Sequence, residues 1–317
     1  MIDRLFPPKE LLVDEQVQSP LFKLPPELRE TIWQLTVASY DNLDRPYEIN
    51  SHYCRPGYTH AQKIDTALLR TCRKIYLEAY HLPLSCNTIA FWAYRGPKGE
   101  PDVRRNLGYD SGAEVALDED DTPWHFARFR RNPETPIKCL RKAHWFVQQY
   151  WLECDNFLFA THSIEMANVE HLTITLRRGD QWNYLDLQAI GIDPRWPAAV
   201  TAKRMREIWA RDEAGEEVPY HTDAFGFHIQ HLAKLHTFTL EIEGEAAQET
   251  ELSDIVKHAK QYWSFPHHSG KKMIADEKVG VEKWAGPSCL ATPRRNFQRV
   301  SEKAHLIKYA LKFSVFE

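Results

Sequence analysis

Apolar side chains recur with a helical period near the start of the chain. The prolines at 25 and 26 can occupy the first turn of a helix without losing an intrahelical hydrogen bond, and Glu27 suits its positive end. The pattern predicts a helix from Leu24 to about Ala38. Its apolar stripe consists of Leu28, Ile32, Trp33, Leu35 and Val37.

A second helical pattern opens near Asp65 and is stopped by Pro83. Its apolar face is formed by Leu68, Cys72, Ile75, Tyr76 and Ala79. The β-branched and aromatic residues at 87–92 then predict a strand. Between the two helices, residues 47–49 predict a short strand.

Three later segments share a pattern that fits strands, at residues 140–147, 169–176 and 235–242. The last two alternate apolar and polar residues as half-buried strands do. Helical patterns occupy residues 157–166, 198–211, 227–234 and 252–263, whereas residues 304–316 fit a helix or a strand. Helix-then-strand units at uneven spacing predict an α/β fold, either a layered body or a degenerate leucine-rich-repeat-like array.

The chain divides into three parts by composition. Residues 20–94 hold the two helices and the first strand. Residues 95–121 are polar, with no sustained period, and predict a long loop. Residues 122–317 begin with a short helical pattern through Phe129 and form the body. We expect this body to be continuous with the N-terminal part, because the strand at 87–92 must pair with another strand.

Composition excludes several classes of function. The 317 residues are 43% hydrophobic and 26% charged, which is enough to bury a large core. A formal net charge of -4 provides no overall positive field for nucleic acid or anionic lipid, so neither is expected as a partner. The sequence shows no secretory signal, no apolar run that could cross a bilayer and no C-x-x-C pair. We therefore expect a cytoplasmic or nuclear protein.

The N-terminal part resembles a group of fungal F-box-like proteins. The resemblance is carried by Leu21-Phe22-Lys23-Leu24-Pro25-Pro26-Glu27-Leu28-Arg29, by Ala67-Leu68-Leu69-Arg70-Thr71-Cys72-Arg73-Lys74-Ile75-Tyr76 and by Ser85-Cys86-Asn87-Thr88-Ile89-Ala90-Phe91. The triplet Glu27-Leu28-Arg29 is also similar to the E-x-R of a related domain. This resemblance covers about the first 94 residues.

An F-box implies an adaptor, whose helices dock the Skp1 subunit of a cullin-RING ubiquitin ligase while the rest of the chain recruits a substrate. The resemblance places the docking face on a set of residues at the first helix: Leu24, Pro25, Leu28, Ile32 and Leu35. The sequence departs from a compact F-box at residues 39–66, which separate the two helices. The alternative is that the apolar stripe packs in the core and the protein is a scaffold with no Skp1 contact.

Candidate catalytic and metal sites are weak. His228 and His231 share a helix face at i, i+3, but no glutamate or cysteine accompanies them as in common zinc motifs. Neither G-x-S-x-G, a P-loop nor a dinucleotide fingerprint occurs. We expect no enzyme activity, no cofactor and no metal, and an enzyme of an unrecognised class ranks third among the hypotheses.

Aromatic residues supply a second candidate face. Trp182, Tyr184, Trp196 and Trp209 lie in polar, proline-marked surroundings. Tryptophan and tyrosine are common interface anchors, so these four residues are candidates for substrate binding. The alternative is local packing of a helix onto a loop. The function expected from the sequence is protein–protein interaction.

Overall fold

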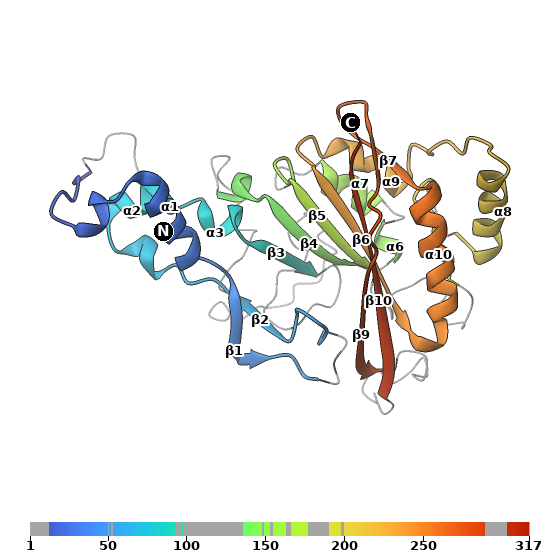
Figure 1. Cartoon of the computed structure of the whole chain (residues 1–317), viewed down its shortest axis with the longest axis horizontal. Helices are drawn as coiled ribbons and strands as arrows, with labels where there is room; N and C mark the ends of the chain where they lie inside the picture. Colours follow the sequence, from blue (N-terminus) through green and yellow to red (C-terminus); the bar gives the residue numbers. More distant parts are fainter. Residues whose placement is uncertain are drawn as a thin grey trace, which may run out of the picture.

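The computed structural model describes residues 13–49, 51, 53–92, 97, 136–147, 149–152, 155–162, 166–176, 190–197, 200–288 and 303–316. These residues form one large sheet with helices and a helical N-terminal lobe (Figure 1). In Figure 1 the lobe and helix α8 (Ala202–Glu213) lie at opposite ends of the molecule. The α/β class expected from the sequence is confirmed.

The N-terminal lobe is built from short helices around a small core. Its helices are α1 (Pro26–Thr36), α2 (Arg73–Ala79) and α3 (Leu82–Ser85), with 3-10 turns at Pro20–Lys23 and Ala67–Arg70. The buried residues of its core are Trp33, Val37, Ile75, Ala79 and Leu82. Strands β1 (Tyr40–Pro46) and β2 (His60–Lys63) pair antiparallel below the helices.

Two predictions for this lobe were wrong. Residues 47–49 are not a strand, and the strand lies earlier, at β1. The second helix is not continuous from Asp65, because it breaks at Thr71 and Cys72 into a 3-10 turn and α2. Pro83 does not only end a helix. It lies in the first turn of α3, where its missing N–H costs no hydrogen bond.

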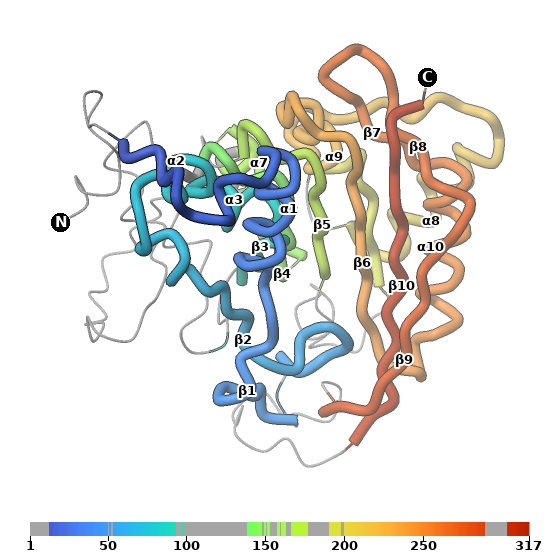
Figure 2. Tube along the Cα trace, turned by 60° about the vertical axis from the view of Figure 1, so that its left-hand side comes forward, coloured from blue at the N-terminus to red at the C-terminus, as the bar shows by residue number. Residues whose placement is uncertain are grey.

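The large sheet has a parallel half and an antiparallel half. The parallel strands follow one another in chain order: β3 (Thr88–Trp92), β4 (Lys142–Val147), β5 (His171–Leu176) and β6 (Thr237–Glu245). The antiparallel strands are β7 (Ser264–Pro266), β8 (Lys272–Ala275), β9 (Gly280–Pro287) and β10 (Lys303–Val315). Because β10 pairs with β6, the C-terminal segment is a strand, which settles the choice between helix and strand. Figure 2 shows β3 to β6 and β10 side by side.

Helices pack on the apolar face of this sheet. They are α6 (Gln149–Leu152), α7 (Asp155–Thr161), α9 (Phe225–His228) and α10 (Glu249–Tyr262), with 3-10 turns at Pro136–Cys139, Ile229–His231 and Ala246–Gln248. Helix α8 lies outside α10 (Figure 1), and its Trp209 stacks on His258 of α10. On β6, Leu240 and Ile242 are buried in the main core with Leu252 of α10. Gly244 permits this contact, because a Cβ there would lie 2.4 Å from the Leu252 side chain.

The opposite face of the sheet is polar. Alternation along β6 places Glu241, Glu243 and Glu245 on this face, and all three are buried.

The helices are shorter than or displaced from the predicted ranges, since the 157–166 pattern ends at Thr161 and the 227–234 pattern ends at His231.

Several sequence predictions fall outside what the structure tests. Residues 95–121 and the helix through Phe129 lie outside the described residues, apart from Pro97. The sequential parallel strands fit an array, but no specific repeat is established, so the leucine-rich-repeat-like array stays a prediction.

Strand β3 joins the N-terminal part directly to the sheet. Among the described residues, no helix has the length and apolar character needed to span a bilayer.

Candidate functional site

Helix α1 carries the residues to which the resemblance assigns docking, and some of them are exposed. Leu28 and Leu35 are 53% and 74% exposed, and Ile32 between them is half-buried against the lobe core. Trp33 and Val37 point the other way and are buried. The apolar residues predicted as one stripe therefore lie on two different faces of α1. One face packs in the lobe core, and the other is open to solvent.

The Leu-Pro-Pro segment at residues 24–26 leads into α1. Leu24 is half-buried, whereas Pro25 and Pro26 are exposed. Pro25 is the N-cap residue and Pro26 the first helical residue, so neither removes an intrahelical hydrogen bond. The structure thus brings together Leu24, Pro25, Leu28, Ile32 and Leu35 on and around one side of a single helix.

An ion pair fixes α1 on α2. Arg29 donates from Nε and Nη2 to the two oxygens of Glu78, at 3.0 and 2.8 Å, and from Nη1 to the Leu24 carbonyl at 2.6 Å. The Trp33 indole also donates to Glu78, at 3.0 Å. The hydrogen bonds from Arg29 lower the pKa of Glu78 against the effect of burial. The arginine of the Glu27-Leu28-Arg29 triplet is therefore architectural and holds the exposed face in place.

Asn87 links the lobe to the sheet. Its buried amide donates to the carbonyls of Val37 and Pro83, at 2.8 and 3.0 Å, and its oxygen accepts from the Ser39 backbone at 2.7 Å. One side chain thus joins the end of α1, the first turn of α3 and the start of β3. This explains in physical terms why an asparagine stands at this point of the third matched segment.

The aromatic candidate face is only partly described. Trp182 and Tyr184 lie outside the described residues. Trp196 and Trp209 are half-buried and pack against the main core. The Arg204 guanidinium lies 4.5 Å from the Trp196 ring, and Trp209 stacks on His258 at 4.4 Å. These two tryptophans lie at the edge of the core, and a substrate-binding role for the four residues stays a prediction.

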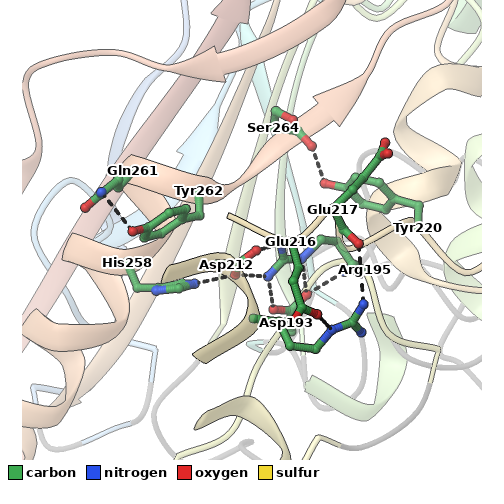
Figure 3. Close-up of polar contacts among 11 residues, drawn as sticks. Asp193, Arg195, Asp212, Glu216, Glu217, Tyr220, His258, Gln261, Tyr262 and Ser264 are labelled. Carbon is green, nitrogen blue, oxygen red and sulfur yellow. Dashed lines mark hydrogen bonds and ion pairs between the residues drawn. The ribbon is translucent and has the colours of Figure 1, made fainter. Parts of the chain in front are cut away.

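A buried charge cluster joins α8, α10 and the segment before α8. Arg195 donates to both carboxylate oxygens of Asp193 and to both of Asp212, at distances between 2.7 and 2.9 Å (Figure 3). Burial disfavours the charge of Arg195, but these hydrogen bonds outweigh it and raise the pKa of the guanidinium. Bidentate pairing on two sides is the geometry that makes a buried arginine tolerable.

His258 extends this cluster into α10. Its Nε2 lies 2.8 Å from Asp212 and must carry the proton, because an ionised carboxylate only accepts. Burial lowers the pKa of His258, and Asp212 opposes that effect. The ring also packs on Tyr262 in a tilted arrangement, with the ring centroids 4.6 Å apart. Nearby, the half-buried Tyr220 donates to the Ser264 carbonyl (Figure 3).

A second polar network crosses the polar face of the sheet. Tyr58 contacts His144 Nδ1 at 2.7 Å, His144 Nε2 contacts Thr175 at 2.7 Å, and Thr175 donates to Glu241 at 2.6 Å. Lys308 pairs with Glu241 at 3.0 Å. Burial, Lys308 and Arg55 keep the pKa of His144 well below its usual value, so its ring is neutral.

The proton positions of this network follow from one another. Thr175 gives its proton to Glu241, so it must accept from His144 Nε2. Nδ1 of the neutral ring is then an acceptor, and Tyr58 donates to it. The hydrogen bonds run in one direction from the N-terminal part of the chain to the centre of the sheet.

Side chains between β1 and β2 contact the same face, from Tyr47, Tyr53, Arg55 and Tyr58. Arg55 pairs with the fully buried Glu243 at 2.7 Å, and its guanidinium lies 5.3 and 4.8 Å from the rings of Trp92 and Phe146. Tyr53 meets Trp92 edge-on at 5.5 Å. The long connection that distinguishes this chain from a compact F-box therefore fastens the lobe to the sheet.

Neither network was foreseen from the sequence. Among the residues that the structure describes, no three His, Cys, Asp or Glu side chains converge as metal ligands would. His228 and His231 stack on each other at 5.6 Å between ring centroids.

Comparisons with family models, with curated proteins and with solved structures find no match. The F-box-like resemblance therefore depends only on the three segments of the sequence that carry it.

Proposed function

We propose that this protein is a protein–protein interaction module that acts as a substrate-recruiting adaptor, with the exposed face of α1 docking a Skp1-like subunit of a ubiquitin ligase. The observation that carries the proposal is the exposure of Leu28 and Leu35 on a helix that opens with Leu-Pro. Large apolar side chains left in water on one helix face are typical of a binding surface.

The distribution of exposed apolar side chains supports this location. Seven of the ten large hydrophobic residues exposed among the described residues lie in the N-terminal part. They are Val17, Leu28, Leu35, Tyr40, Leu43, Ile49 and Leu77. The sheet and its helices, by contrast, bury most of theirs. The Arg29–Glu78 ion pair holds α1 rigidly, which lowers the entropic cost of docking.

A scaffold without Skp1 contact is the second candidate. The observation that favours it is the docking of residues 47–58 on the sheet through Arg55 and Tyr58. In that case the lobe serves to complete the fold. The two functions differ in whether the exposed face of α1 binds a partner protein.

A binding experiment with purified Skp1 separates them. The variant Leu28→Asp, Leu35→Asp changes only exposed side chains, so its fold should survive, which circular dichroism checks. Leu43→Asp is the matched control, because Leu43 is 76% exposed but lies on β1. Each leucine buried at an interface contributes about 1–2 kcal/mol, so the double variant should bind at least about tenfold more weakly.

Binding by the wild type and by Leu43→Asp, with loss in the double variant, is the expected result. No binding by the wild type would leave the scaffold as the better account. Equal binding of Skp1 by the wild type and both variants would mean that the Skp1 contact does not involve the exposed face of α1.

A further inference from the structure

Strand β1 carries exposed apolar side chains on an irregular edge. Tyr40 and Leu43 are 44% and 76% exposed, and Ile49 just beyond the strand is 72% exposed. The register with β2 is regular at Tyr40 and Asp41 and then shifts before Pro46. Leu43 lies in the middle of this shifted stretch.

Carboxylates predominate among the exposed charges around these residues. Between Tyr40 and Ile49 the exposed charged side chains are Asp41, Asp44 and Glu48, and the exposed Lys63 of β2 lies opposite Tyr40. Arg45, the base in this stretch, is half-buried. The edge therefore combines apolar anchors with an acidic border.

We propose that β1 is a docking edge for an extended, lysine- and arginine-rich segment of a partner protein, with apolar side chains that contact Tyr40, Leu43 and Ile49. An extended segment fits because a strand edge pairs through its main chain. Basic residues fit because they meet the acidic border, and like charges across an interface are costly.

The same charges decide against other occupants. A second copy of this chain would bring Asp41, Asp44 and Glu48 against themselves. An anionic membrane surface would be repelled for the same reason. Interpreting the segment as part of a recruited substrate rests on the adaptor function proposed above, whereas the docking edge itself does not.

The test uses a labelled synthetic peptide in which lysine and valine alternate, and a matched peptide with glutamate in place of lysine. Fluorescence anisotropy should show binding of the lysine peptide alone, weaker at high salt. Leu43→Ser, and separately Asp44→Lys, Glu48→Lys, should each weaken binding at least about tenfold. Hydrogen exchange should show protection of the β1 amides in the complex.

Matched controls come from elsewhere on the surface. Val281→Ser removes a side chain that is 51% exposed on β9, and Glu213→Lys reverses an exposed charge at the end of α8. Neither should change peptide binding. Peptide binding that is absent, that survives the β1 variants, or that falls equally in the controls would overturn the docking edge.

The result also separates this inference from the adaptor function. The variant Leu28→Asp, Leu35→Asp should bind the peptide as the wild type does. Peptide binding at β1 without Skp1 binding would remove the adaptor function and keep the docking edge. Skp1 binding without peptide binding would keep the adaptor function and remove the docking edge.

Discussion

Replacing Arg195 should have the largest stability effect of any single change in the α8–α10 region. Arg195→Met keeps much of the side-chain volume and removes the cation that faces Asp193 and Asp212, whose side chains are 0% and 6% exposed. Removing one partner of a buried, hydrogen-bonded ion pair costs about 3–5 kcal/mol, because the remaining charge stays buried. Here two carboxylates are left facing each other, so we expect the upper part of that range.

The loss should depend on pH. Protonation of a carboxyl group, or of His258 beside Asp212, relieves the repulsion that the substitution creates. The loss of stability should therefore be smaller near pH 5.5 than near pH 8. Urea denaturation followed by tryptophan fluorescence at the two pH values measures this difference.

A matched control makes the measurement specific. Arg204→Met removes an arginine that is 42% exposed and pairs with Glu207 on the surface of α8. Surface pairs of this kind contribute at most about 1 kcal/mol. A loss below about 1 kcal/mol for Arg195→Met, or one that is the same at both pH values, would refute the reasoning about the cluster.

Three further predictions concern the lobe and its attachment. Because the folded-state pKa of His144 lies well below that of an unfolded histidine, the unfolded state binds the extra proton. Wild-type stability should then fall by about 1.4 kcal/mol per pH unit below ~6.5, and His144→Gln should flatten that slope in urea titrations. Arg55→Met breaks the buried pair with Glu243, so hydrogen exchange should rise at residues 40–63 while β5 and β10 stay protected; a uniform rise would contradict this. Glu78→Gln loses the charge that pairs with Arg29, so exchange in α1 should rise a few-fold and Skp1 binding should weaken although no residue of the exposed face has changed.

Elements with local signals could be predicted from the sequence. Helix α1 is predictable because two prolines and an apolar repeat lie within one short segment, and β3 because it consists of aromatic and β-branched residues a few positions after Pro83. Strand β10 could have been predicted too. Its Ile307, Tyr309, Leu311 and Phe313 alternate strictly and all face the main core.

The exposed side of α1 shows what the period of apolar residues leaves undetermined. An apolar stripe at i, i+4 and i+7 does not say whether it faces the core or solvent. On α1 the answer depends on which neighbours the helix has. Trp33 is buried in the core of the lobe and its indole donates to Glu78 of α2, whereas Leu35 is 74% exposed.

The polar networks could not be predicted for a different reason. Arg55 and Glu243 are 188 positions apart in the chain, and Tyr58 and His144 are 86 apart. No spacing rule links such residues, because their proximity follows from the sheet order. Once β4, β5 and β6 are known to be parallel neighbours, alternation places His144, Thr175 and Glu241 on one face, and the network follows.

The most direct test of the central claim is a hydrogen-exchange footprint of purified Skp1 on the wild-type protein. If α1 is the docking helix, amides in residues 24–36 should be protected on addition of Skp1, while those in β5, β6 and β10 should not change. The absence of any protection, or protection confined to the sheet, would contradict the proposed docking face.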